Sequence, residues 1–458
     1  MVLLVGFWGG TLYFASIILV LILEVETDQK RSIIFLRMFV HPLNVAISDS
    51  QNKYQYVVCK HTISVFAGEK LVGYWVDTDQ RDSHNSYKKL KSNAGDAKLK
   101  GSQGIGAPPV YSYIRNLRLT SDEGKLIACV DSDKSVVIFK IDTAAEDPEK
   151  FLQVMKRQQF PKRPNALALA DEDTTIIVAD KFGDVYKLKI DEEPIRKIDD
   201  QSEPILGHVS MLTDVAVAKD ANNKSYIITT DRDEHIKISH YPQTFIVDKW
   251  LFGHKEFVSS VDLPKWQTKF LFSAGGDKEI FAWNWQSGEL LSQYSFEDAV
   301  KPFINDQHLA PARFQNEENN VIEYAVASIK SCGQQPYVAF FVEATPVLFI
   351  LHCNTETGEL SLAQQVEFKH NVVSISSNGK SEYLVTFDNR DENAEQLIAF
   401  LTYSGDSNKP FSVDENLNKL NSSWISTFKQ KDELLADADS VYPLYNIASL
   451  KKHGEHFS

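Results

Sequence analysis

Short runs of β-branched and aromatic residues alternate with clusters of Gly, Asp, Asn and Ser along the chain from Met38 onward. This pattern predicts strands joined by turns, and no long amphipathic helical period interrupts it. The strand pattern also repeats itself. A Gly-His pair occurs in ILGHVSMLTDV (205–215) and in LFGHKEFVSSV (251–261), and a hairpin pattern follows each, YIITTDRDEHIKIS (226–239) and FLFSAGGDKEIFAW (270–283).

The hairpin pattern recurs at a spacing typical of propeller blades. Weaker copies lie at 126–139 and 175–188, and the outgoing strands of the four copies begin at Val136, Val185, Ile236 and Ile280, at intervals of 49, 51 and 44 residues. A period of about 40 to 50 residues fits one four-stranded blade per repeat. Less regular units at 54–66, 337–352 and 383–403 bring the total to seven. The sequence therefore predicts an all-β fold, a seven-bladed WD-repeat β-propeller.

The propeller pattern covers residues 38–403, with polar insertions expected at about 78–108 and 297–320. A polar segment with a basic C-terminal tail is expected over 404–458. Residues 1–37 differ, because Val2 to Leu23 carry no charge and are long enough to span a bilayer. No Lys or Arg precedes this run, and Met38 opens the soluble pattern with MFVHPLN, so we interpret 1–37 as an artefact of start-site assignment. A membrane-anchored propeller is the alternative.

The stretch DRDEHIKISHYP (231–242) contains carboxylates, two histidines and a serine, which together suggest a catalytic site. The repeat argues against catalysis, because the same residue types recur at the same offsets in the next copy. Such residues form the buried hydrogen-bonding tetrad of a WD repeat. The predicted tetrads are His254, Ser273, Asp277 and Trp283 in one copy, and His208, Thr229 and Asp233 in the other, with Ser239 in place of the tryptophan.

Four charged or polar residues of this stretch have no place in the predicted tetrad: Arg232, Glu234, His235 and Lys237. On a strand, 236 and 238 would face the blade interior, and 235 and 237 the other side. Lys237 is therefore expected to have no role in the core. The residues form either a solvated charged surface or a patch that docks a partner.

Composition limits the function further. The formal net charge of −14 argues against a chain that binds nucleic acid by itself, since binding to the phosphate backbone depends on Lys and Arg. No motif for catalysis, nucleotide binding or a metal occurs, so we expect no catalytic residue, no metal and no cofactor. The basic tail residues Lys451 and Lys452 are the candidate RNA contacts, although a solvated tail is the simpler interpretation.

Several stretches resemble a known family, the non-catalytic WD-repeat subunit of the fungal tRNA (guanine-N7) methyltransferase. They include GIGAPPVYSYIRNLRLTSDE (104–123), DKFGDVY (180–186), DRDEHIKISHYPQTFIVDKWLFGHK (231–255) and NDQHLAPARFQNE (305–317). The resemblance covers most of the chain from Met38 onward.

The resemblance implies a nuclear protein without catalytic activity. It would bind and stabilise a separate catalytic subunit, as a heterodimer, for N7-methylation of a variable-loop guanosine in tRNA. That subunit would bind S-adenosylmethionine and would make most of the contacts to the tRNA. The resemblance also places the central segment on the partner-facing surface, with Arg232 and Lys237 contacting acidic groups of the partner. The alternative is a generic WD-repeat adaptor, for instance in a ubiquitin ligase.

Overall fold

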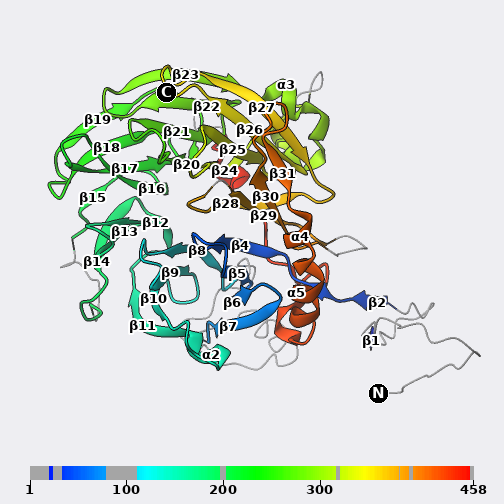
Figure 1. The fold of residues 1–458 in the computed structure, drawn as a ribbon. Helices are drawn as coiled ribbons and strands as arrows, with labels where there is room; N and C mark the ends of the chain where they lie inside the picture. The colour runs from blue at the N-terminus through cyan, green and yellow to red at the C-terminus, as the bar shows by residue number, and fades with distance from the viewer. Residues whose placement is uncertain are drawn as a thin grey trace, which may run out of the picture.

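The computed structural model describes residues 38–78, 111–195, 203–315, 320–380, 382–390 and 396–453, together with the backbone of 20–23 and 34–37. Within this part of the chain, seven four-stranded antiparallel sheets follow one another around a ring (Figure 1). Each sheet contains four consecutive strands, so every blade is one repeat of the sequence. The predicted seven-bladed propeller is confirmed.

The strands are short, as the turn clusters in the sequence predict. Blade 1 contains β4 (Leu43–Ser48), β5 (Gln55–Cys59), β6 (Thr62–Ala67) and β7 (Lys70–Val76), and blade 2 contains β8 (Ile114–Leu119), β9 (Lys125–Val130), β10 (Ser135–Ile141) and β11 (Leu152–Gln159). Blade 3 contains β12 (Pro164–Ala170), β13 (Thr175–Asp180), β14 (Asp184–Lys189) and β15 (Leu206–Gly207), and blade 4 contains β16 (Leu212–Lys219), β17 (Ser225–Asp231), β18 (Ile236–Tyr241) and β19 (Val247–Leu251). Blade 5 contains β20 (Val258–Asp262), β21 (Phe270–Gly275), β22 (Glu279–Asn284) and β23 (Glu289–Ser295), and blade 6 contains β24 (Val326–Ser331), β25 (Tyr337–Val342), β26 (Val347–Cys353) and β27 (Leu360–Glu367). Blade 7 contains β28 (Val372–Ser377), β29 (Glu382–Phe387), β30 (Ile398–Tyr403) and β31 (Phe411–Val413). A short helix, α2 (Pro148–Phe151), precedes β11.

The core lies between neighbouring blades, so the middle strands are buried on both faces. In blade 4, Ile228 and Ile238 pack with Trp283 of blade 5, whereas Ile227 and Tyr241 pack with side chains of blade 3. The hydrophobic effect therefore acts on both faces of these strands, which explains their nearly continuous apolar sequences.

The C-terminal region closes the ring, and the prediction that the propeller ends at residue 403 is wrong. Strand β31 is the outer strand of blade 7, and α4 (Glu415–Asn418) and α5 (Leu420–Phe428) follow it. Trp424 of α5 is fully buried and stacks on Phe66 of blade 1 with ring centroids 4.3 Å apart. Strand β32 (Leu435–Ala436) then pairs with β3 (Phe39–Val40). Since blades 1 and 7 exchange no strand, these contacts hold the seam.

The predicted insertion at 297–320 is a connection between blades 5 and 6, built from α3 (Glu297–Val300) and three 3₁₀ turns, η1 (Lys301–Phe303), η2 (Asp306–His308) and η3 (Ala312–Phe314). The insertion predicted at 78–108 lies, apart from Thr78, outside the described residues. Of residues 1–37 the structure describes only β1 (Val20–Leu23) and β2 (Ile34–Arg37), which pair with each other. Among the described residues, none of the helices has the length and apolar character needed to cross a membrane.

The last described segment crosses one face of the ring. The backbone N–H of Tyr442 donates to His41 Nε2 at 3.0 Å, and Tyr113 donates its hydroxyl to the Pro443 carbonyl at 2.7 Å. Further along, the buried Glu343 carboxylate accepts three backbone N–H groups, from residues 446, 447 and 448. The segment 442–448 therefore ties blades 1, 2 and 6 together from the face that carries the β17–β18 turn.

Candidate partner-docking site

The turn between β17 and β18 is shaped by Asp231, the last residue of β17. Its Oδ1 accepts the backbone N–H of Asp233 at 2.8 Å and that of His235 at 3.0 Å. Glu234 lies at the tip with φ at +67°, a left-handed conformation that tight turns require. The side chains of this turn are therefore presented from a backbone held by hydrogen bonds at both ends.

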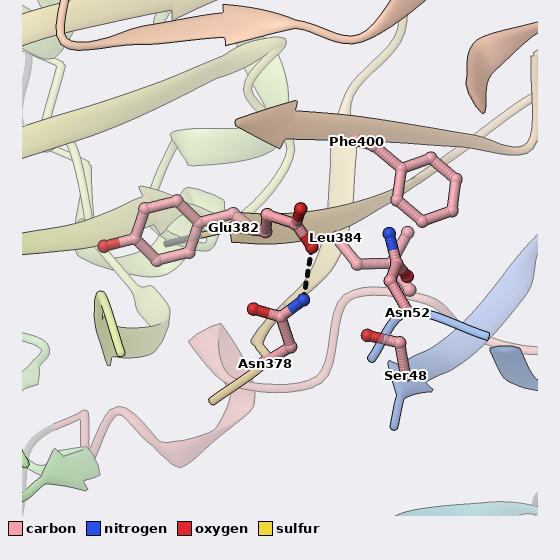
Figure 2. Close-up of a pocket in the computed structure, with 7 residues that line it drawn as sticks. Ser48, Asn52, Asn378, Glu382, Leu384 and Phe400 are labelled. Carbon is pink, nitrogen blue, oxygen red and sulfur yellow. Dashed lines mark hydrogen bonds between the residues drawn. The ribbon is translucent and has the colours of Figure 1, made fainter. Parts of the chain in front are cut away.

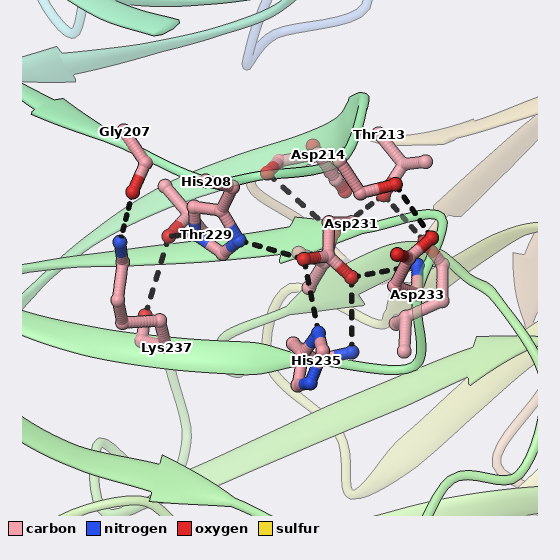
Figure 3. A network of polar contacts seen from close by, with 12 residues as sticks. Gly207, His208, Thr213, Asp214, Thr229, Asp231, Asp233, His235 and Lys237 are labelled. Atoms are coloured by element: carbon pink, nitrogen blue, oxygen red, sulfur yellow. Dashed lines mark hydrogen bonds and ion pairs between the residues drawn. The ribbon is translucent and has the colours of Figure 1, made fainter. Parts of the chain in front are cut away.

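Behind the turn lies a buried polar network (Figure 3). His208 Nδ1 is 2.8 Å from Asp231 Oδ2, and His208 Nε2 is 2.7 Å from Thr229 Oγ1. Burial lowers the pKa of His208, so its imidazole is neutral at neutral pH. The carboxylate can only accept, which means that Nδ1–H donates to Asp231 and Nε2 accepts from the hydroxyl of Thr229.

Blade 5 repeats this network with a tryptophan added. His254 Nδ1 lies 2.7 Å from Asp277 Oδ2, and His254 Nε2 lies 2.7 Å from Ser273 Oγ, which also accepts the indole N–H of Trp283 at 2.9 Å. In blade 4 the tryptophan position holds Ser239, whose buried Oγ has no hydrogen-bond partner in the described part of the chain.

The prediction that Asp233 belongs to the blade 4 network is wrong, and Asp231 takes that position. The prediction placed the aspartate four positions after the strand residue of the network, because Asp277 follows Ser273 at that distance and Asp233 follows Thr229 likewise. The spacing from histidine to aspartate is the conserved quantity within this chain, 23 residues both from His208 to Asp231 and from His254 to Asp277. That spacing was visible in the sequence and would have identified Asp231.

Lys237 is not free of the core, so that expectation is wrong. Only 6% of the residue is exposed, its Nζ donates to the Gly207 carbonyl at 2.5 Å, and it lies 5.4 Å from the centroid of the Trp250 ring. The side of β18 that carries Lys237 is covered because a blade is packed on both faces. Burial lowers the pKa of Lys237, and no carboxylate among the described residues forms an ion pair with it.

Arg232 contacts the C-terminal segment through carbonyl groups. Its Nε donates to the Leu450 carbonyl at 2.6 Å and its Nη2 to the Lys451 carbonyl at 3.3 Å. Carbonyl oxygens orient a guanidinium without neutralising its charge. Arg232 therefore presents a fixed cation at the edge of the turn.

The expectation of a freely solvated basic tail is wrong for Lys451 and Lys452. Lys451 forms an ion pair with Glu256, and Lys452 Nζ lies 2.5 Å from Asp233 Oδ1. A contact of either lysine with RNA stays a prediction. Between this segment and the turn lies an open cavity of about 280 Å³, lined by Arg232, Asp233, Glu234, His235, Lys255, Glu256, Phe257 and Lys452.

An exposed apolar patch adjoins the turn, which the sequence analysis missed. Val209 is fully exposed, and Trp250 and Phe252 are 37% and 73% exposed. The Trp250 ring packs edge-on against the rings of His235 and His208. Large exposed apolar side chains beside a polar rim are typical of protein interaction sites.

A second hollow lies at the seam between blades 1 and 7 (Figure 2). Ser48 and Asn52 line it from blade 1, and Asn378 donates to the Glu382 carboxylate on the opposite side. It has essentially no free volume, so it is part of the packing of the seam. No group of three or more potential metal ligands occurs among the described residues.

The ring of repeated four-stranded blades and the histidine–aspartate networks define a WD-repeat β-propeller. Two solved structures share the fold at 11% sequence identity: U3-55K, with a TM-score of 0.53 over 77% of this chain and 91% of that one, and the RRP9 WD40 repeats, with 0.52 over 78% and 92%. A family model described as the tRNA methyltransferase TRM82 WD40 domain matches residues 48–204 and 191–399.

Close relatives give the family. The tRNA (guanine-N(7)-)-methyltransferase non-catalytic subunit TRM82 of Candida glabrata is 99% identical over 421 residues, which are 92% of this chain and 100% of that protein. The protein of the same name from Saccharomyces cerevisiae is 45% identical over 92% of this chain and 99% of its own length. The chain belongs to this family of non-catalytic subunits of tRNA (guanine-N7) methyltransferase.

Proposed function

We propose that this chain binds and stabilises the catalytic methyltransferase subunit, with which it forms a heterodimer that methylates N7 of a variable-loop guanosine in tRNA. The names of the relatives support a separate catalytic partner. In this proposal the partner binds S-adenosylmethionine and supplies most of the contacts to tRNA, since this chain has a net charge of −14. The complex works in the nucleus.

The observation that carries the proposal is the surface around the β17–β18 turn. Arg232 at the edge of the turn and the nearly buried Lys237 behind it are both hydrogen-bonded to carbonyl oxygens, so neither charge is neutralised by a carboxylate at those contacts. Acidic groups of the partner complement such cations. Trp250 and Phe252 supply the apolar contact area beside them, and exposed aromatic side chains contribute strongly to binding energy.

The geometry of the turn also favours a scaffold role. Asp231 holds the backbone under Glu234 and His235 before any partner arrives. A surface that is already ordered loses little conformational entropy on binding. The turn therefore suits stable association more than a transient encounter.

Charge reversal at the turn tests the proposal. Arg232→Glu should lower the affinity for the catalytic subunit at least tenfold and lower N7-methylguanosine formation on tRNA in proportion, because one favourable charge pair becomes repulsive. Lys219→Glu is the matched control, since Lys219 is an exposed cation at the far end of β16 that pairs with Glu172. Equal affinity of both variants, with their fold intact, would contradict docking at this turn.

A further inference from the structure

The C-terminal segment Leu450–His453 lies directly on the proposed docking turn. It begins at the last residue of 3₁₀ helix η5 (Ala448–Leu450), whose first residue is fixed by the Glu343 carboxylate. The anchoring contacts of residues 442–448 therefore lead the chain to the turn. The position of Leu450–His453 follows from the fold of the ring as well as from its own contacts.

Every residue of this segment engages the propeller. The carbonyls of Leu450 and Lys451 accept from Arg232, and Lys452 pairs with Asp233. At its end, His453 Nε2 lies 2.5 Å from Glu323 Oε1, and the His453 ring stacks on Phe314 with centroids 4.4 Å apart. The segment thus bridges blade 4 to the connection between blades 5 and 6.

The segment also sets the charge of the docking surface. Lys451 and Lys452 neutralise Glu256 and Asp233, which would otherwise surround Arg232 with uncompensated carboxylates. Their side chains remain 23% and 27% exposed, so they form part of the surface that a partner meets. Without the two lysines, the carboxylates of Glu256 and Asp233 at the rim of the cavity would be unpaired and would repel acidic groups of a partner.

We propose that Leu450–His453 is an integral part of the docking surface for the catalytic subunit. The segment orients Arg232, and its two lysines allow the rim of the cavity to bind an acidic segment of the partner. This inference rests on the proposed function. The residues of the segment act as positioning residues, because they fix Arg232 and balance its neighbours.

Truncation tests the inference. A chain that ends at Ser449 should bind the catalytic subunit at least tenfold more weakly than the full chain, measured by isothermal titration calorimetry. Its thermal unfolding midpoint should stay close to that of the full chain, because the contacts of residues 442–448 remain. A chain that ends at His453 is the matched control and should bind like the full chain. Equal binding of the chain ending at Ser449 would overturn the inference, and so would an equal loss in both truncations.

A second variant guards against a folding defect in the truncated chain. K451A/K452A keeps the carbonyls that orient Arg232 and removes only the two cations, so affinity should fall severalfold at low salt. The difference should shrink at high salt, because the lost effect is electrostatic and screened. A loss that does not change with salt would overturn the charge argument. If the full chain itself fails to bind the catalytic subunit, the proposed function fails and not only the role of this segment.

Discussion

The imidazole of His208 and the carboxylate of Asp231 lie 2.8 Å apart, and the next blade repeats the pair as His254 and Asp277 at 2.7 Å. In blade 4 the same carboxylate also accepts two backbone N–H groups of the proposed docking turn. Asp231 therefore links the interior of the blade to the proposed docking surface. This link makes the turn rigid without any contact to a partner.

Substitution should separate Asp231 from Asp233. Asp231→Ala leaves His208 and the N–H groups of the turn without their acceptor, and should lower the free energy of unfolding by about 3 kcal/mol. Asp233→Ala breaks a partly exposed ion pair with Lys452 and should cost under about 1 kcal/mol. Chemical denaturation of both variants measures the difference. Similar losses would mean that Asp231 has no special place in the network.

Lys237→Met tests the charge of Lys237 separately from its packing. The methionine keeps an apolar stem against Trp250 and should change the free energy of unfolding by at most about 1 kcal/mol. Affinity for the catalytic subunit should fall severalfold, because the nearly buried ammonium group no longer adds its positive charge to that of Arg232 beside the turn. Calorimetric titration with the catalytic subunit checks this. Unchanged affinity would assign Lys237 a purely structural role.

Trp424→Ala tests the closure of the ring. The indole is fully buried between α5 and blade 1, and its N–H donates to the Gly68 carbonyl at 2.9 Å. Its removal should destabilise the protein by about 3 to 5 kcal/mol, as for other buried aromatic residues. Trp250→Ala, which removes a partly exposed ring, is the control and should lower the melting temperature much less. Calorimetric melting of both variants gives the comparison.

Stability should decrease in mild acid because of buried histidines. Burial lowers the pKa of His41 to about 3, and it lowers that of His208 as well. Below about pH 6.5 the unfolded chain binds protons at these positions more readily than the folded chain, so the free energy of unfolding falls with the pH, for His41 down to about pH 3. Each group contributes a slope of at most about 1.4 kcal/mol per pH unit.

A variant identifies the contribution of His41. His41→Gln removes the titrating ring and retains an oxygen that can accept the Tyr442 N–H. The free energy of unfolding, measured by denaturation at several pH values, should then depend less steeply on pH between 6.5 and 4. The same slope in both proteins would show that His41 does not titrate on unfolding.

The repeat in the sequence determined the architecture. Apolar runs that recur every 44 to 51 residues, each with a hairpin turn, can bury both faces only by stacking against neighbouring copies, and a ring of seven follows. The tetrad of blade 5 was also predictable, because its four residue types have a fixed spacing along the chain.

Tertiary structure alone decided what surrounds the β17–β18 turn. Residues 442–453 follow the last blade in sequence, yet they return across the ring to Glu343, Arg232 and Asp233. Contacts between segments more than 100 residues apart leave no periodic signal in one sequence. Lys237 and Lys452 also looked free in the sequence, although packing covers Lys237 and an ion pair holds Lys452.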